Sequence, residues 1–361
     1  MTTWRVIDTG IRPAAHNIAL NRALLEARQQ EASPSTLHFL RFEPCALLGY
    51  HQSAGQELNL DYCQANGIAI QRRITGGGAI YFDETQIGWE LYLHKRDLGS
   101  ADMNVISRRI CEAAARGISS LGVDAQFRPR NDIEVAGRKI SGTGGAFDGD
   151  ALMYQGTLLI RFDVEKMLRV LKIPAEKLSD KAISSARERV ANLADLLGTP
   201  PADEAVKAAL SAAFAAEFGV HFVPGELNAH EQNLYIQALA EIDHPDWIDL
   251  HVRPQADRPT LEAAQKFPGG LLRVNVAFDR TQARIKQVWF SGDMFISPRR
   301  TLVDLEAALR DTLAENMEHT VQEFFAGREV DMLTLNAVDF VSVIQQALAQ
   351  DAATVPQETT A

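Results

Sequence analysis

The sequence predicts an α/β (α+β) fold, with a mainly antiparallel or mixed sheet flanked by helices and a small α+β accessory domain after it. Two observations support this prediction. Short apolar runs bounded by Gly, Pro and polar residues alternate with stretches of helical periodicity. The chain also has 361 residues, whereas a typical domain has about 150. We therefore expect two domains.

The first half of the chain predicts two amphipathic helices among several strands. Residues 14–31 carry Leu20, Leu24 and Ala27 at helical spacing, and residues 103–121 show the same periodicity. The runs between and after these helices are short, apolar or aromatic, and bounded by turn residues. The predicted strands are 37–42, 46–50, 68–72, 79–82, 88–93, 133–135, 138–140 and 156–162.

The second half predicts a helical stretch, a linker and a separate small unit. Helical patterns extend from residue 164 to about 243, and three prolines follow between His244 and Pro259. Alternating apolar residues then predict a hairpin over 272–290, with helices at 301–315, 320–326 and 337–349. The predicted domains are a catalytic domain at 1–245, a linker at 246–258, an accessory domain at 259–345 and a disordered tail at 346–361.

Composition excludes several classes of protein. Lys plus Arg number 36 against 47 Asp plus Glu, a net charge of −11, which disfavours a broad surface for nucleic acid or anionic membranes. Three scattered cysteines are too few for a disulfide framework or a thiolate zinc site. The start lacks a signal-like pattern, and apolar stretches of membrane-spanning length are absent. We expect a cytoplasmic protein with no nucleic-acid or membrane partner.

The densest chemical signal is Arg72-Arg73-Ile74-Thr75-Gly76-Gly77-Gly78-Ala79, between two predicted strands. Successive glycines let the backbone approach a ligand and aim N–H groups at an anion, and arginines supply charge for phosphate or carboxylate. The segment is neither a P-loop nor a dinucleotide fingerprint. Taken alone, it is equally consistent with a glycine-rich strand connection and solvated arginines.

A second signal runs from Asn131 to Gly145, where residues 133–135 and 138–140 predict a hairpin. Arg138 and Lys139 then point to opposite faces, so only one of them can enter a shared cleft. Gly156-Thr157 at the start of a strand is a weaker signal. A surface hairpin with an incidental lysine is the alternative interpretation.

Together these three blocks resemble the lipoate-protein ligase family in order and approximate spacing. The flanking segments are also similar to that family: Glu43-Pro44, Leu47–Gln52, Glu57–Tyr62 and Arg189–Leu193. The hairpin ending in Gly292-Asp293-Met294-Phe295 looks like the accessory domain of its longer members. The resemblance covers residues 1 to about 320 and implies the biotin/lipoate ligase-like fold.

The resemblance implies a two-step reaction. Lipoate, or octanoate, reacts with ATP in the presence of Mg²⁺ to form an acyl-adenylate and pyrophosphate, and the acyl group then passes to a lysine of a lipoyl-carrier protein. Lys139 matches the family's motif lysine and is the candidate catalytic residue. Its ammonium is a compact charge suited to bridging a carboxylate and a phosphate as they join. We expect a monomer.

The resemblance also implies roles for residues around Lys139. Arg73 would hold phosphate or adenylate, Thr75 would lend a hydroxyl, and Tyr81 and Gln86 match adenine contacts. Asp132 is the predicted Mg²⁺ ligand, because hard cations favour carboxylate oxygen. The predicted binding residues for ATP and lipoyl-AMP are Arg73, Thr75, Gly76, Gly77, Gly78, Ala79, Tyr81, Gln86, Asn131, Asp132, Ser141, Gly142, Gln155, Gly156 and Thr157.

The chain departs from the family pattern at three points. Phe82 stands where members usually have His, Thr85-Gln86 replaces Gly-Asn, and Gln155 replaces the His before Gly-Thr. Glutamine still donates and accepts hydrogen bonds, so we expect adjusted binding with retained chemistry. Phe82 either widens an apolar lining or belongs to the core, and we favour the core.

Other functions remain open at this point. An octanoyl or lipoyl amidotransferase on the same scaffold would need a cysteine thiolate beside the motif lysine, but residues 122–197 contain no cysteine. Cys45 or Cys63 would then have to fold toward the site, although buried thiols are the commoner fate. A biotin ligase would share the adenylation chemistry. A non-catalytic lipoyl-handling protein is the alternative outside enzymes.

Overall fold

The computed structural model describes residues 2–100, 102–129, 131–172, 184, 186–251, 260–332 and 334–353. The chain forms two compact units. The first is built from the residues up to Leu48, Ala54–Thr75 and Ala79–Asp249, and the second from Gly49–Ser53, Gly76–Gly78 and the chain after Asp249. Two short segments that we placed in the catalytic domain therefore pack with the C-terminal unit.

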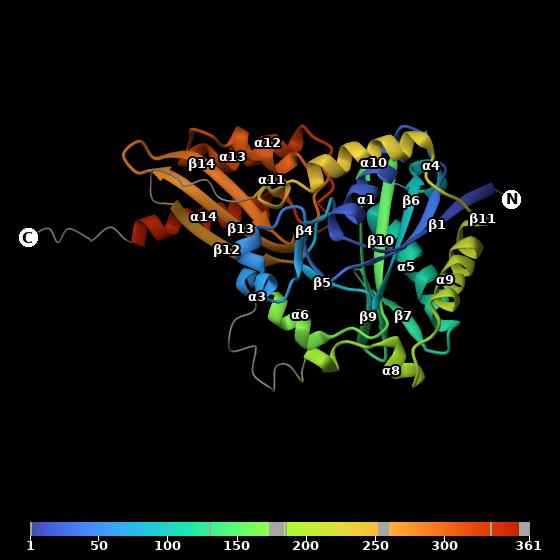
Figure 1. The fold of residues 1–361 in the computed structure, drawn as a ribbon. Helices are drawn as coiled ribbons and strands as arrows, with labels where there is room; N and C mark the ends of the chain where they lie inside the picture. The colour runs from blue at the N-terminus through green and yellow to red at the C-terminus, as the bar shows by residue number, and fades with distance from the viewer. Residues whose placement is uncertain are drawn as a thin grey trace, which may run out of the picture. The chain divides into compact units, whose positions relative to one another are not determined.

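The first unit is centred on an eight-stranded mixed sheet with the order β11-β1-β2-β6-β10-β9-β8-β7 (Figure 1). Strand β1 runs parallel to β11 and β2, and the other neighbours are antiparallel. The strands are β1 (Thr2–Arg12), β2 (Thr36–Phe42), β6 (Gln86–His94), β7 (Ala125–Arg128), β8 (Asp132–Val135), β9 (Arg138–Asp148), β10 (Ala151–Leu159) and β11 (Val220–Pro224). The predicted mixed sheet is confirmed.

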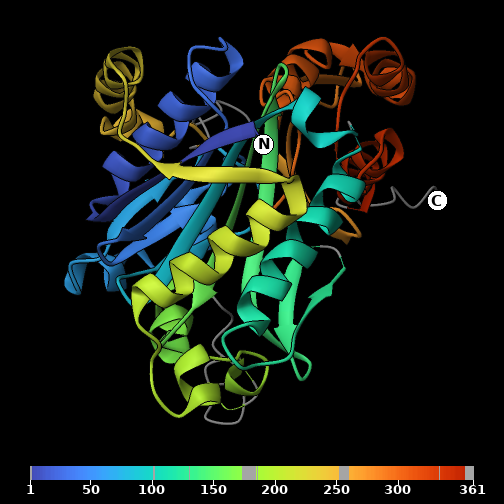
Figure 2. The ribbon, with the colours of Figure 1, turned by 90° about the vertical axis from the view of Figure 1, so that its right-hand side faces the viewer.

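The main core lies on one face of this sheet, where α5 (Met103–Ser119) and α9 (Asp203–Phe218) cover it (Figure 2). Trp89 of β6 and Tyr154 of β10 are fully buried in this layer. The two helices approach closely at Gly117, where a Cβ would lie 3.0 Å from the carbonyl oxygen of Ala209.

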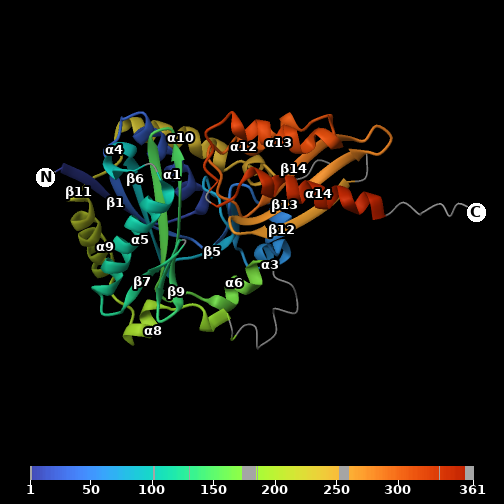
Figure 3. The same ribbon diagram turned by 180° about the vertical axis from the view of Figure 1, so that it is seen from behind.

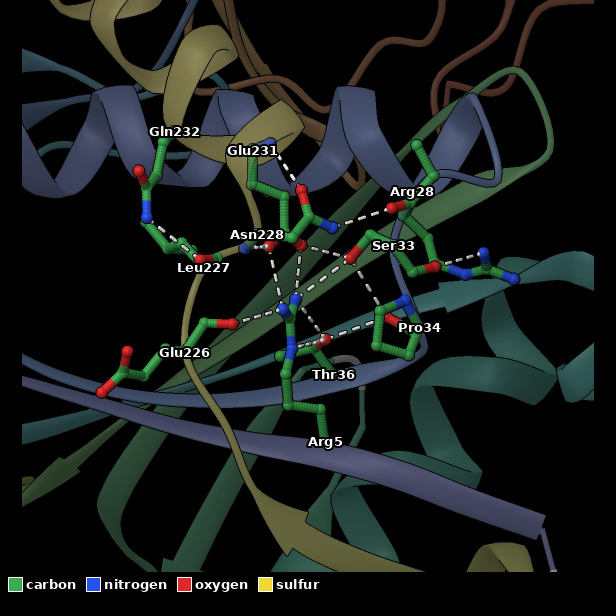
Figure 4. Close-up of polar contacts among 11 residues, drawn as sticks. Arg5, Arg28, Ser33, Pro34, Thr36, Glu226, Leu227, Asn228, Glu231 and Gln232 are labelled. Carbon is green, nitrogen blue, oxygen red and sulfur yellow. Dashed lines mark hydrogen bonds and ion pairs between the residues drawn. The ribbon is translucent and has the colours of Figure 1, made fainter.

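The opposite face carries α1 (Ala14–Gln29), and α10 (Ala229–Ile242) packs beside α1. A buried ion pair ties α10 to β1: the Arg5 guanidinium donates to both carboxylate oxygens of Glu231 at 2.8 and 2.5 Å (Figure 4). Ser33 and the backbone N–H of Asn228 also donate to this carboxylate. Three short helices also belong to this unit: α4 (Lys95–Leu98), α8 (Leu193–Leu197) and α11 (Pro245–Ile248).

A smaller three-stranded sheet completes the first unit, with the order β4-β3-β5. Its strands are β3 (Cys45–Leu48), β4 (Ala69–Arg72) and β5 (Ile80–Phe82). A separate apolar cluster joins it to α2 (Ala54–Glu57), α3 (Leu60–Ala65) and α6 (Val164–Val170). The motif segment that starts at Arg72 leaves from the end of β4.

The second unit is an antiparallel sheet with the order β12-β13-β14-β15, covered by helices (Figure 3). The expected hairpin is present as β13 and β14, and their inward residues Leu272, Val274 and Phe290 form its core with α14. Its elements are β12 (Thr260–Phe267), β13 (Gly270–Asp279), β14 (Arg284–Gly292), α12 (Thr301–Ala308), β15 (Thr312–Leu313), η2 (Ala314–Asn316), α13 (Met317–Ala326) and α14 (Ala337–Ala353).

Two helices extend across predicted domain boundaries. Helix α14 continues to Ala353, through the first part of the segment expected to be a disordered tail, because its apolar face packs on β12 and β13. Helix α11 occupies the start of the predicted linker, whereas residues 252–258 lie outside the described part. None of the helices in the described part of the chain is both long and apolar enough to cross a membrane.

Candidate functional site

Strand register brings several predicted site residues to one face of the large sheet. Thr157 lies opposite Gly142 on β9, and Gln155 lies opposite Gly144. Asp132 of β8 is the next partner of Gly142. Directly opposite residues share a face, and residues two apart on a strand do so as well. Asp132, Gly142, Gln155 and Thr157 therefore share one face of the sheet, away from the core with α5 and α9.

Lys139 is fixed at the edge of this face from two sides. Its Nζ lies 2.7 Å from Oδ1 of Asp132. Its backbone N–H donates to the Arg189 carbonyl and its carbonyl accepts from the Ala191 N–H, both at 2.8 Å. The Arg189–Leu193 motif thus holds the main chain of Lys139, and its side chain remains 41% exposed.

Gly142 provides the space in which the end of Lys139 lies. A Cβ at this position would lie 2.9 Å from both Cε and Nζ of Lys139. Real Cβ atoms essentially never approach that closely. The glycine of the Gly-Arg-Lys-Ile-Ser-Gly motif therefore sets where the ammonium can sit.

Both oxygens of the Asp132 carboxylate are already engaged by cations. Oδ1 accepts from Lys139, and Oδ2 accepts from Arg128 at 2.6 Å. Arg128 also contacts Glu134 at 3.2 Å. In the described ranges no group of three His, Cys, Asp or Glu side chains can hold a metal ion. The structure thus supports Asp132 as the partner of Lys139.

Asn131 acts on the backbone of the hairpin. Its Nδ2 donates to the Thr143 carbonyl at 2.6 Å, and its own carbonyl accepts from the N–H and the hydroxyl of Thr143. This exchange closes the pairing of the Asn131 segment with β9. In this structure Asn131 therefore holds Asp132 in register.

Thr75 and Gln155, both in the first unit, contact each other. Nε2 of Gln155 donates to Oγ1 of Thr75 at 2.9 Å. Thr75 is 1% exposed and is the last residue of the first unit before Gly76. The two residues are eighty positions apart, so sequence alone does not indicate this contact.

The two arginines of the motif have different environments. Arg72 is fully buried, its Nε donates to the Trp247 carbonyl at 3.0 Å, and the Trp247 indole donates back to the Arg72 carbonyl at 2.9 Å. Arg73 donates from Nη1 to the Leu47 carbonyl at 2.9 Å, and burial lowers the pKa of its guanidinium to about 10. Arg73 thus keeps its charge at neutral pH.

The glycines at 76 and 77 are explained by contacts inside the second unit. The Gly77 N–H donates to the Met294 carbonyl at 3.0 Å, and a Cβ on Gly76 would lie 2.1 Å from the same oxygen. Gly77 has φ +92°, and its Cβ would meet the Phe295 ring at 2.7 Å. We predicted these glycines among the binding residues for ATP and lipoyl-AMP; in this structure Gly76 and Gly77 leave room for Met294 and Phe295.

Several predicted binding residues lie in the core instead of on the site face. Ser141 lies opposite Ile133 and Leu158, which belong to the main core. Gly156 lies opposite Trp89, and a Cβ there would be 2.1 Å from Cζ2 of its indole. The one-residue alternation of side chains in a strand separates both from their neighbours Gly142, Gln155 and Thr157.

The predicted adenine contacts are buried, Tyr81 in β5 of the smaller sheet and Gln86 at the start of β6 of the large sheet. Tyr81 is 1% exposed, and Gln86 donates from Nε2 to its carbonyl at 3.4 Å. Phe82 packs on Phe42 with ring centroids 4.6 Å apart, so it belongs to the core as we favoured. Ala79 is half-buried next to them. The structure gives these residues a packing role.

The three cysteines are free and buried. Burial raises the pKa of the thiols of Cys45, Cys63 and Cys111. The Cys111 sulfur lies 3.3 Å from the hydroxyls of Thr143 and Tyr154. A nucleophilic thiol must be accessible and ionised, and these environments favour neither condition.

The comparison with known proteins decides the family. The lipoyl protein ligase A/B catalytic domain matches residues 13–215. This chain belongs to that family. The resemblance found in the sequence motifs is thereby confirmed, as is the mixed α/β fold with a separate antiparallel unit.

Members of this family with different names are similar to the chain. An octanoyltransferase, LipM of Kyrpidia tusciae, is 30% identical over 271 residues, covering 68% of this chain and 98% of LipM. Lipoate–protein ligase 1 of Staphylococcus aureus is 28% identical over 328 residues, covering 88% of this chain and 93% of the relative. The family relationship therefore identifies a lipoate ligase or octanoyltransferase scaffold and leaves the acyl donor open.

A solved structure agrees with this assignment. The bipartite lipoate protein ligase of Thermoplasma acidophilum, studied with its E2 lipoyl domain, aligns with a TM-score of 0.61 at 28% identity. The alignment covers 71% of this chain and all of the neighbour.

Arg128 is the residue that sequence reasoning missed. It lies directly opposite Asp132 in the β7–β8 pair. Recognising strand β7 would have placed Arg128 beside Asp132. The strand has only four residues, however, and they are too mixed in polarity for apolar periodicity to reveal it.

Proposed function

We propose that this protein is an ATP-dependent lipoate-protein ligase that forms lipoyl-AMP and transfers the lipoyl group to a lysine of a carrier domain. The observation that supports this best is the ammonium of Lys139, held at 2.7 Å from Asp132 above the bare backbone of Gly142. The burial of all three thiols favours an adenylate over an acyl-thioester intermediate.

The first step joins two anions, so the site must supply positive charge. A lipoate carboxylate oxygen attacks the α-phosphorus of ATP, a P–O bond forms, and the bond to pyrophosphate breaks. Lys139 bridges the carboxylate and the α-phosphate, and its attraction grows as charge develops in the transition state. Mg²⁺ is expected to arrive on the phosphates of ATP, because it keeps most of its water and needs few protein ligands.

The second step transfers the acyl group to protein. The neutral ε-amine of a carrier lysine attacks the acyl carbonyl, an amide forms, and AMP leaves. A lipoyl domain of a 2-oxoacid dehydrogenase is the expected class of acceptor, since the Thermoplasma acidophilum neighbour was studied with its E2 lipoyl domain. We place this reaction in the cytoplasm and expect a monomeric enzyme.

Pyrophosphate release tests the proposal. Purified protein is mixed with lipoate and Mg·ATP without an acceptor, and pyrophosphate is measured in the burst phase. We expect about one equivalent per site, and a roughly hundred- to thousandfold slower burst in Lys139→Ala, the usual cost of losing a preorganised donor. A wild-type protein without a burst, but with lipoate and ATP bound, would overturn the proposal.

The runner-up function is an octanoyltransferase that uses a thiolate and no ATP, as the similarity to LipM suggests. It predicts acyl transfer from an octanoyl-carrier thioester without ATP. It also predicts loss of that transfer after alkylation or in a Cys45→Ala or Cys63→Ala variant. Acyl transfer that requires ATP and survives iodoacetamide treatment would exclude it.

A further inference from the structure

The hydrogen bond between Gln155 and Thr75 has a consequence that rests on the proposed ligase function. We infer that Gln155 is a positioning residue: its amide N–H holds the Thr75 hydroxyl so that this hydroxyl donates its own proton to an anionic oxygen of the reacting groups. Gln155 thereby acts through Thr75 and need not touch the substrate.

The contact lies on the same face of the sheet as Lys139. Gln155 is two residues from Thr157, which is opposite the Gly142 position under the Lys139 ammonium. Nε2 of Gln155 reaches Oγ1 of Thr75 at 2.9 Å. Thr75 is therefore brought to the face on which the proposed reaction takes place.

The direction of this bond decides what Thr75 can do. A hydroxyl has one proton to donate and two lone pairs. Because Oγ1 accepts from the Gln155 amide, the hydroxyl proton points elsewhere, and no described residue supplies an acceptor for it. Thr75 is only 1% exposed, and a buried donor without an acceptor is unfavourable. An oxygen of a bound carboxylate or phosphate would accept the hydrogen bond from the Thr75 hydroxyl.

An amide at position 155 keeps this arrangement independent of pH. A carboxylate there would only accept, and would turn the Thr75 proton toward itself; an imidazole would change with protonation. The titratable group directly opposite Gln155 is Glu90 on β6, which is bonded to His38 and Tyr92. Lys139 lies at the edge of the same sheet face beside Asp132, and Arg73 stands two residues before Thr75. These groups are common to all variants, so variant-to-wild-type rate ratios isolate position 155.

The test is the pH profile of the pyrophosphate burst in Gln155→Glu relative to wild type. At pH 7.5 we expect a loss of about ten- to a hundredfold, the usual worth of a hydrogen bond to a charged group. As pH falls toward 4.5, near the ordinary pKa of a Glu side chain, the ratio should recover, because the protonated carboxyl again donates to Thr75. Unchanged rates, or a loss equal at every pH, would overturn the inference.

A double-mutant cycle with Thr75→Val shows whether Gln155 acts through the hydroxyl. We expect the double variant to be no slower than Thr75→Val alone at pH 7.5, and Thr75→Ser to stay within a few-fold of wild type. Multiplicative losses would overturn the inference. If Gln155→Glu does not fold, Gln155→His serves instead, with a rate ratio that rises at acid pH in support and a flat ratio against.

The outcomes separate the two hypotheses. Absence of a burst in the wild type refutes the ligase function itself. A normal wild-type burst with a pH-independent Gln155→Glu ratio refutes only the positioning role.

Discussion

Replacing Gly142 by alanine tests the position of the Lys139 ammonium without removing its charge. The new methyl group would lie 2.9 Å from Cε and Nζ of Lys139, whereas carbon contacts settle at about 3.5–4.0 Å. The end of Lys139 must therefore move by roughly 0.6–1 Å. A displacement of about 1 Å in a catalytic group can cost about a hundredfold in rate. We expect a pyrophosphate burst slower by about ten- to a hundredfold.

The stability of this variant should change little. Lys139 is 41% exposed and flexible at its end, so it can shift without disturbing the core. We expect a change of less than about 1 kcal/mol in the free energy of unfolding. Gly55→Ala in α2 is the matched control, because its Cβ meets nothing within 4 Å. Gly142→Ala with a wild-type burst and wild-type stability would refute the assigned position of Lys139.

Three further predictions concern stability. Gly156→Ala pushes a methyl group into the buried Trp89 indole and should lower the free energy of unfolding by about 1–3 kcal/mol in urea titrations; an unchanged midpoint would contradict the packing role. Burial alone would raise the pKa of Glu231, but the hydrogen bonds from Arg5 and Ser33 outweigh it and hold the pKa below its ordinary value. This ion pair therefore stabilises the fold above about pH 4 and is lost as pH falls through the lowered pKa, so Glu231→Gln should cost about 3–5 kcal/mol at pH 7 and much less near pH 3; an equal cost at both pH values would argue against the pair. Burial raises the pKa of Glu306, which accepts the Phe290 N–H at 2.8 Å, to about 7. Stability should then fall as pH rises from about 4.5 to 7, and Glu306→Gln should remove this decline, worth about 3 kcal/mol, in melts followed from pH 4.5 to 8; parallel curves would show that the carboxyl is not buried in solution.

Local patterns in the sequence were sufficient to predict helices and strands whose apolar residues all lie on one face of the element. The spacing of apolar residues in α5 and the alternation along β13 and β14 predicted these elements correctly. Strands β1, β7, β11, β12 and β15 were not predicted, and β15 lies inside the segment predicted to be a helix over 301–315. For β1 the reason is its partner: it pairs with Val220–Pro224, more than two hundred residues away, and local sequence cannot reveal such a pairing.

The candidate site shows the same division. The motif predicted Lys139 as the candidate catalytic residue, and the resemblance identified the family, which the family match confirms. The sheet register then separated true neighbours from apparent ones: Gln155 and Thr157 share the face of Gly142, whereas Gly156 between them faces the core. That register also places Asp132 beside Lys139. One oxygen of the Asp132 carboxylate contacts Lys139, and the other accepts a hydrogen bond from Arg128 of β7.

The sequence by itself determined that residues 76–78 have a backbone free enough for close approach, and it predicted Lys139 and its flanking motif as the candidate site. Only the tertiary structure decided what uses that freedom, because a glycine permits contact with any backbone or ligand that folding brings to it. Here Met294 and Phe295, over two hundred residues later in the chain, occupy the space beside Gly76 and Gly77. Sterics permitted the approach, and long-range packing selected the partner.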